Sequence, residues 1–263
     1  VSWISETTQF SQYPTQQLLE GKEMRIGVFH SILWSVATTA TSNGSVNAAM
    51  SSLTPLAGGI ALLNIQLGEV IFGGVGSGMY GMILFILLTV FIAGLMVGRT
   101  PEYLGKKIET KEIKWTMVAI LIPNLLILLM SSLAVYLESG IKEVSHTGPH
   151  AVTEILYAFS SAAGNNGSAF AGLNANSTFY LITTGISMLL GRFGVIVPIL
   201  IIAGSLAKKN QTPISAGTLE THTPLFGFLL IGIIIAVGAL TFFPVLAIGP
   251  FLEHLLLNAQ LTF

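Results

Sequence analysis

Two stretches that repeat one another determine the fold: LWSVATTATSNGS at residues 33–45 and LYAFSSAAGNNGS at residues 156–168. In each, Leu and an aromatic residue are followed by small residues and then by Asn-Gly-Ser. Gly44 and Gly167 lie 123 positions apart (167 − 44 = 123), and the same offset aligns Leu67-Gly68-Glu69 with Leu190-Gly191-Arg192 (192 − 69 = 123). Because two separate patches share one offset, the chain is predicted to contain a duplicated unit.

The surroundings of the two stretches predict the same architecture in both units. A semi-apolar segment of about three turns, too short to cross a membrane, comes before each polar run, and a long apolar segment follows it. Both units begin on the same side of the membrane, so they are parallel repeats, unlike the inverted repeats of many secondary transporters. A short re-entrant helix, a polar turn with glycine and an inner helix together form the pore unit of a cation channel.

Long segments without charge predict four transmembrane helices. A span needs about 20 apolar residues to cross the hydrocarbon core. The candidates are residues 79–97, 116–137, 179–207, which only Arg192 interrupts, and 225–248. Pro123, Pro198 and Pro244 lie within them, which membrane helices tolerate better than soluble ones.

The composition excludes several functional classes. Of 263 residues, 52% are hydrophobic and 9% are charged, with a net charge of −1, whereas soluble domains carry about 25% charged residues. An ordinary cytoplasmic enzyme and a nucleic-acid binder are therefore excluded. The chain has no Cys. It also has no Asp, so it lacks the aspartyl-phosphate nucleophile of ion-pumping ATPases, and no P-loop motif is present. We expect no catalytic residues and no bound nucleotide here, so another chain must bind any ATP.

The distribution of Lys and Arg predicts the orientation. Residues 98–115 contain five of these basic residues and residues 208–224 contain two, while the connection 138–178 contains one and the tail after residue 248 none. The positive-inside rule therefore places the first two segments in the cytoplasm. The connection and the C-terminus are then extracytoplasmic.

The polar runs predict a filter made of backbone carbonyl groups, which replace the hydration shell of a potassium ion. Gly44 and Gly167 allow the positive φ values that turn carbonyl groups toward one axis. The side chains of the neighbouring polar residues can brace the loop, and each preceding helix directs its negative C-terminal end at the pore. Asn-Gly alone would indicate an ordinary turn, but duplication beside a membrane span favours a filter. The candidate residues are Thr41, Ser42, Asn43, Gly44, Gly164, Asn165, Asn166 and Gly167.

Four glycines predict a break in the inner helix of the first unit. Gly73, Gly74, Gly76 and Gly78 fall within six residues, and Gly in a helix interior costs about 1 kcal/mol. Close packing of small residues is the alternative. The G-x-G-x-x-G match at 76–81 is a poor dinucleotide site, because no strand precedes it.

Glu69 and Arg192 are the two charges expected within the membrane, at equivalent depths of the two units. Embedded charges face water or a partner. They either pair with one another, or Arg192 lines an ion exit; the alternative for Glu69 is an interfacial position.

His146 and His150 have the spacing H-x-x-x-H within the connection 138–178. Zinc needs three or four ligands, and the loop offers no third, so we expect solvated loop histidines. An intramembrane serine hydrolase using Ser168 or Ser77 would need a histidine, and none lies in a predicted span.

At the two polar runs the chain resembles the third and fourth filter segments of the potassium-binding A subunit of the Kdp potassium-transporting ATPase. The resemblance rests on TTATSNGSVN at 38–47 and AGNNGSAFAG at 163–172. It extends to VGRTPEYLGKKIE at 97–109, SAGTL at 215–219 and THTP at 221–224.

The resemblance implies an all-α integral membrane protein of tandem parallel helix–pore helix–filter–helix repeats, plus one extra C-terminal transmembrane helix. Residues 1–111 would be the third repeat without its outer helix, residues 112–210 the fourth, and residues 211–263 the last helix and tail. The glycine-rich segment would be a gating loop under the pore. Two of four repeats cannot close a filter, so we expect more polypeptide upstream.

The resemblance also implies partners and a location. The chain would select potassium from outside and pass it on for uptake driven by the catalytic B subunit, a P-type ATPase, together with the smaller C and F subunits. It would lie in the bacterial cytoplasmic (inner) membrane. The alternative is a stand-alone potassium channel or cation symporter of the same superfamily.

Overall fold

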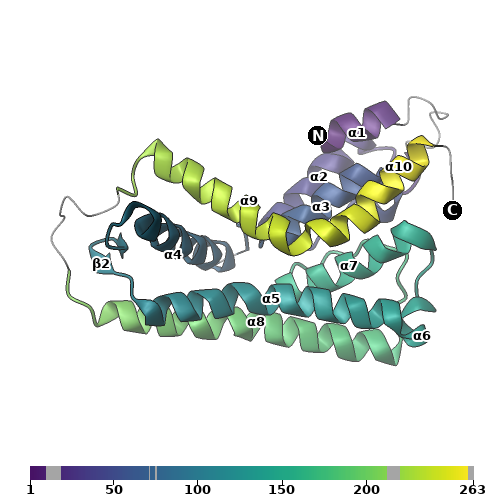
Figure 1. Ribbon diagram of the computed structural model, residues 1–263. Helices are drawn as coiled ribbons and strands as arrows, with labels where there is room; N and C mark the ends of the chain where they lie inside the picture. Colours follow the sequence, from purple (N-terminus) through teal and green to yellow (C-terminus); the bar gives the residue numbers. More distant parts are fainter. Residues whose placement is uncertain (10–18, 71, 75, 212–219, 260–263) are drawn as a thin grey trace.

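The computed structural model describes residues 1–9, 19–70, 72–74, 76–211 and 220–259, and these are mostly helical (Figure 1). The motif at 215–219 lies outside the described residues. The elements are α1 (Ser2–Gln9), α2 (Gly27–Thr41), η3 (Met50–Ser52), α3 (Pro55–Gln66), α4 (Ser77–Val97), β1 (Glu102–Tyr103), β2 (Lys106–Lys107), α5 (Thr110–Tyr136), α6 (Glu138–Ile141), α7 (Gly148–Gly164), α8 (Thr178–Ala207), α9 (Pro224–Leu246), the π-helical η4 (Ala247–Phe251) and α10 (Leu252–Asn258).

The four predicted spans are confirmed as long apolar helices. They are α4, α5, α8 and the continuous helical segment Pro224–Asn258, which joins α9, η4 and α10. Helix α5 begins at Thr110, before the uncharged stretch, because Glu109 and Glu112 form a capping box at its N-terminus. Pro123, Pro198 and Pro244 all lie inside helices, as expected.

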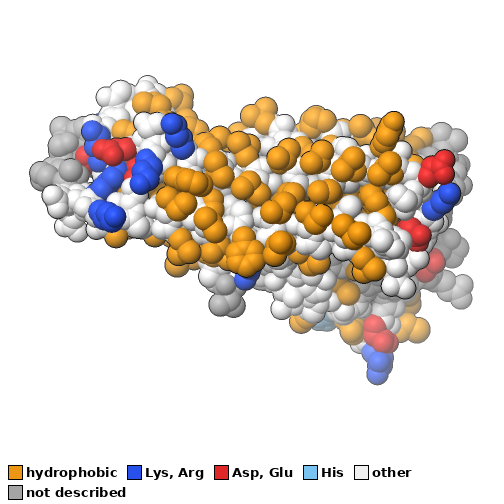
Figure 2. Space-filling view, turned by 90° about the horizontal axis from the view of Figure 1, so that it is seen from below, with side chains coloured by type: hydrophobic (Ala, Val, Ile, Leu, Met, Phe, Trp, Pro, Cys, Tyr) orange, Lys and Arg blue, Asp and Glu red, His pale blue; other side chains and the backbone are white. Residues whose placement is uncertain are grey.

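Helices α5 and α8 run side by side along the length of the molecule, and α7 packs on both (Figure 1). One hydrophobic core joins α2, α3 and α7, and a second joins α4, α5, α8 and α9. Seen from the side of α5 and α8, the surface is a broad apolar belt, with most of the Lys and Arg side chains in view at one end (Figure 2). Lys209 donates to Lys107 O at 2.9 Å, so the basic segments 98–115 and 208–211 share one end of the spans, as the predicted topology requires.

The inner helices of the two units differ. The first unit continues as α3 and α4, which are separated by the non-helical residues 67–76, of which 71 and 75 are not described. In this break Gly68, Gly73 and Gly76 have positive φ. The second unit continues as α8, an unbroken helix of 30 residues. The expected break at the glycines is therefore present.

A candidate ion-binding site at two abutting loops

The loops that follow α2 and α7 have the same backbone conformation. Helix α2 ends at Ser42 with φ 53° and ψ 42°, and α7 ends at Asn165 with φ 57° and ψ 32°. Both residues are in the left-handed region. Two positions further on, Gly44 has φ 83° and Gly167 has φ 91°, values that favour glycine. Positions related by the offset of 123 thus adopt equivalent dihedral angles.

Equivalent hydrogen bonds hold the two loops. The amide of Asn43 donates to Thr38 O at 3.2 Å, and that of Asn166 donates to Ser161 O at 3.0 Å. The Asn43 side-chain oxygen accepts from the amide of Ser45 at 3.1 Å, and the Asn166 side chain does the same for Ser168 at 3.0 Å. These Asx turns brace the loops through asparagine side chains, as expected.

The two loops abut one another. A Cβ atom added to Gly44 would lie 2.4 Å from Asn166 O and 3.2 Å from the Cα of Gly167, so only glycine fits there. The Asn166 side chain donates to Thr38 O at 2.9 Å, which joins the second loop to the end of α2. Loops that are 123 positions apart in sequence therefore form one continuous polar surface.

The carbonyl groups of both loops are available to a ligand. No described residue donates a hydrogen bond to a carbonyl oxygen of residues 41–44 or 164–167. The nearby amides of Asn43, Ser45, Asn166 and Ser168 are instead used inside the loops. The arrangement leaves carbonyl oxygen atoms of both loops without a described donor, which suits a cation.

Glu69 lies directly beside the two loops. Its Oε1 accepts from the Asn166 side chain at 2.6 Å. It is 7% exposed, and its depth in the membrane, within the core or at the interface, stays a prediction. Among the ion pairs of the described residues, none joins Glu69 to Arg192. Direct pairing, one of the two options, is therefore not observed.

A cavity of about 130 Å³ lies next to the second loop, among α3, α4, α5, α8 and α9. Gly164 and Asn165 contribute to its wall, and so do both Glu69 and Arg192. The cavity thus connects the loop carbonyl groups with the two charges that the sequence places within the membrane.

The glycine-rich segment packs against the base of the first loop. The amide of Gly73 donates to Ala40 O at 3.1 Å, and a Cβ on Gly74 would lie 3.3 Å from Ser42 Cβ. A Cβ on Gly73 would lie 2.2 Å from Gly78 Cα, so the two backbones can approach this closely only because both residues lack a side chain. Gly76 has open space around it. The segment therefore combines a helix break with close packing of small residues, the two interpretations that the sequence left open.

The remaining polar side chains of the loops brace the structure. Thr41 Oγ1 donates to Ala37 O at 2.8 Å, and the Asn165 side chain donates to Met188 O at 3.3 Å. Ser168 bonds with Tyr157 and Asn166. No histidine among the described residues bonds with Ser168.

The aromatic residue of each unit supports its loop, a role that the sequence pattern had not suggested. Tyr157 OH lies 2.7 Å from Ser168 Oγ, and Trp34 Nε1 donates to Ser45 Oγ at 3.2 Å. The signal was present in the repeat, since the aromatic residues and the serines keep the offset of 123 (157 − 34 = 123; 168 − 45 = 123).

Comparison with known proteins gives one consistent result. The family model of the potassium-transporting ATPase A subunit matches residues 1–255. The potassium-transporting ATPase potassium-binding subunit of Leptospira interrogans is 55% identical over 264 residues, covering 100% of this chain and 47% of the relative. The subunits of the same name from Herpetosiphon aurantiacus and Sorangium cellulosum are 60% and 59% identical, over 91% and 90% of this chain. The chain spans less than half the length of these relatives.

Proposed function

Because this chain belongs to the family of the potassium-transporting ATPase A subunit, we propose that its two loops bind potassium as half of a selectivity filter. The ion ligands are the carbonyl oxygens of residues 41–44 and 164–167. The four apolar helices make the chain a multi-pass membrane protein. The observation that carries the proposal is the contact between two loops of equal geometry whose carbonyl oxygens have no described donor.

The charge of the site supports a cation as the ligand. Each loop follows the C-terminal end of a helix, α2 or α7, where the helix dipole is negative. The Glu69 side chain adds a carboxyl group between the loops and the cavity. A dehydrated potassium ion leaves the filter through this cavity, and Arg192 in the cavity wall repels it from remaining there.

The rest of the filter and the energy source come from other polypeptide. The named relatives are more than twice as long as this chain, so we propose that their additional half supplies the other filter repeats. Their name as an ATPase subunit supports ATP hydrolysis by the catalytic P-type B subunit, with the C and F subunits completing the complex. Residues 98–115 and 208–224 face the cytoplasm of a bacterial cell, and the C-terminus is extracytoplasmic.

Replacing the two loop glycines tests the filter. In the full-length protein within its complex, we expect Gly44→Ala and Gly167→Ala each to weaken the apparent potassium affinity at least tenfold, about 1.4 kcal/mol. A methyl group at Gly44 would overlap Asn166 O, and both residues have positive φ. The measurement is the potassium dependence of ATP hydrolysis by the purified complex.

Gly204→Ala is the matched control, because Gly204 lies in α8 with open space around it. Its potassium affinity should equal that of the wild type. Unchanged affinity in both loop variants would overturn the filter assignment. A potassium-conducting preparation with no ATPase chain bound would favour the stand-alone channel instead.

A further inference from the structure

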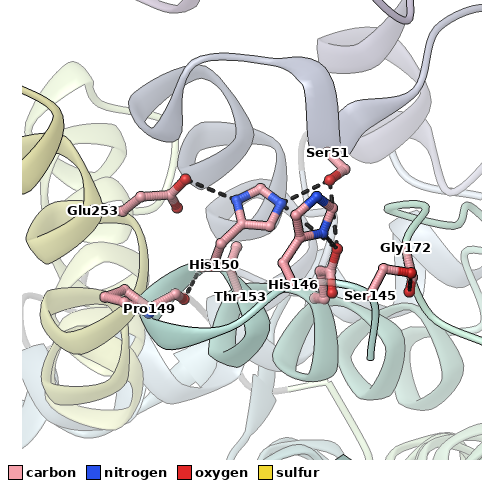
Figure 3. A network of polar contacts seen from close by, with 9 residues as sticks. Ser51, Ser145, His146, Pro149, His150, Thr153, Gly172 and Glu253 are labelled. Carbon is pink, nitrogen blue, oxygen red and sulfur yellow. Dashed lines mark hydrogen bonds and ion pairs between the residues drawn. The ribbon is translucent and has the colours of Figure 1, made fainter. Parts of the chain in front are cut away.

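A second polar cluster lies at the N-terminal end of α7, around His146, His150 and Glu154 (Figure 3). His146 Nδ1 is 2.6 Å from Glu154 Oε1, and His150 Nε2 is 3.6 Å from the same oxygen. The two imidazole rings meet edge to face, with their centroids 4.6 Å apart. One ligand atom from each of the three residues lies within 4.8 Å of the other two.

The expectation of solvated histidines without a third ligand is wrong. The side chain of His150 is mostly buried, that of His146 is half exposed, and that of Glu154 is fully buried. His150 and Glu154 are four residues apart on α7, so they share one face of the helix. The prediction considered the loop alone and did not count the carboxylate that the first turns of α7 add to it.

The backbone holds His146 over this face. The amide of Ser145 donates to Gly172 O at 2.9 Å, and the Ser145 hydroxyl donates to the same oxygen. Val144 and Leu173 form an isolated antiparallel bridge next to this contact. Gly172 leaves the space that the carboxylate needs, since a Cβ there would lie 1.9 Å from Glu154 Oε1.

The carboxylate of Glu154 is incompletely satisfied. Its Oε1 faces the two histidines, while its Oε2 is buried and has no hydrogen-bond partner among the described residues. A buried polar oxygen without a partner is unfavourable. A cation held against this carboxylate would offset part of that cost through its charge.

Glu253 of α10 orients His150 from the other side. Its Oε1 lies 2.7 Å from His150 Nδ1, so this nitrogen donates to the carboxylate and Nε2 is left with its lone pair. Ser51 Oγ of η3 lies 2.7 Å from Nε2. The carboxylates of Glu154 and Glu253 therefore flank His150 on two sides, which favours a bound cation.

We propose that His146, His150 and Glu154 form a binding site for a divalent transition-metal ion, zinc being the representative member of the class. Two imidazole nitrogens and one carboxylate oxygen are a ligand set that zinc prefers and that potassium, calcium and magnesium do not. A water molecule completes the tetrahedron, within reach of the Ser51 hydroxyl. The hydrogen bond from the distal nitrogen of His150 to Glu253 is the usual support of a metal-bound histidine.

The distances fit this assignment after two adjustments, the first of which is that the Ser51 hydroxyl gives up its 2.7 Å contact with His150 Nε2. Two ligand atoms of a tetrahedral zinc ion lie about 3.3 Å apart, because each is 2.0–2.2 Å from the metal. The 3.6 Å between His150 Nε2 and Glu154 Oε1 is close to this value. His146 has to move outward by about 0.7 Å from its 2.6 Å contact. The half-exposed side chain of His146 has room for that movement.

Metal binding to the intact complex tests the site. The complex, purified through a tag without histidines and stripped with a chelator, is titrated with zinc chloride by calorimetry. We expect His146→Ala to weaken zinc binding at least tenfold and Glu253→Gln, which changes only the support of His150, to weaken it 10- to 100-fold. Cobalt should give the visible absorption of a tetrahedral site in the wild type and lose it in His146→Ala.

His222→Ala is the matched control, because His222 is an exposed histidine of the segment before α9, away from the cluster. Zinc binding in this variant should equal that of the wild type. His146 is half exposed, so the metal-free His146→Ala complex should keep its thermal stability and its potassium-stimulated ATPase. No saturable zinc binding, or equal binding in His146→Ala and His222→Ala, would overturn the site and leave the cluster as a hydrogen-bond network.

Discussion

The two loop units have the same backbone but different surroundings. Leu33 is 54% exposed and Trp34 47%, whereas their equivalents Leu156 and Tyr157 are 1% and 0% exposed. Asn43 is exposed in the first loop, and Asn166 is buried in the second. The loop conformation is therefore a property of the local sequence. The burial of each unit depends on the elements that pack around it. In this chain the second unit is covered by its neighbours, whereas part of the first unit is exposed.

The two units also differ at Gly68 and Gly191, which occupy equivalent positions after the loops. Gly191 lies inside the unbroken α8, and a Cβ there would be 2.1 Å from Ala163 O of α7. Gly68 lies two residues after the end of α3, with φ 83° and only Val70 near its missing Cβ, at 3.8 Å. The first unit is thus loosely packed at the position where the second has a close helix–helix contact.

The largest difference in stability that we expect between equivalent variants of the two units is at Asn166 and Asn43. Asn166→Ala removes the Asx turn and the bonds to Thr38 and Glu69, and at about 1 kcal/mol for each bond should destabilise the full-length protein by about 3 kcal/mol. Asn43→Ala removes the equivalent Asx turn alone and should cost about 1 kcal/mol. Denaturant unfolding of the two variants measures this difference. Equal losses would contradict the comparison and show that Asn43 has a second partner outside this chain.

A smaller difference is expected at the glycines of the inner helices. Gly191→Ala forces a methyl group against Ala163 O and should cost about 2 kcal/mol, within the usual range of overpacking effects. Gly68→Ala has space but an unfavourable φ and should cost about 1 kcal/mol. Thermal unfolding of the complex gives the stabilities, and Gly185→Ala in open space on α8 is the control. A larger loss of stability in Gly68→Ala than in Gly191→Ala would contradict the expectation that the chain is packed more closely at Gly191.

The smallest expected effect on stability is at Leu33, and it tests what covers the first unit. The chain has no Cys, so Leu33→Cys and Leu156→Cys introduce unique thiols into these repeats. In the full-length protein without other cysteines, we expect both to react slowly with a membrane-permeant maleimide, because the additional half proposed above covers Leu33. Rapid labelling of Leu33→Cys would show that this face remains open to water and is not covered by the additional half.

Much of the fold could be predicted because the relevant energies are local. The four spans follow from the transfer free energy of consecutive apolar residues. The structure extends the second by six residues at its N-terminus (116 − 110 = 6), where Glu109 caps the helix, and the last by ten residues at its C-terminus (258 − 248 = 10). The left-handed turns at Ser42 and Asn165 follow from Asn-Gly chemistry within a few residues. The helix break at Gly73 and its neighbours has the same local cause.

The pairing of distant side chains could not be predicted from these patterns. Asn166 reaches Glu69 across 97 positions and Thr38 across 128, and His150 reaches Glu253 across 103. Glu69 and Arg192 sit at equivalent repeat positions, yet Glu69 bonds with the loop residue Asn166 and not with Arg192. The sequence pattern indicated that Glu69 and Arg192 could pair, but the packing of the two units brings Asn166 to Glu69.

By itself, the sequence determined a duplicated, membrane-spanning chain with two glycine-containing loops, because hydropathy and backbone dihedral preferences act over a few neighbouring residues. Only the tertiary structure decided that the loops abut at Gly44 and Asn166, that Glu69 lies beside them, and that two histidines share a buried carboxylate. These contacts depend on how helices pack in three dimensions. Packing brings together residues whose separation along the chain carries no information about their distance in space.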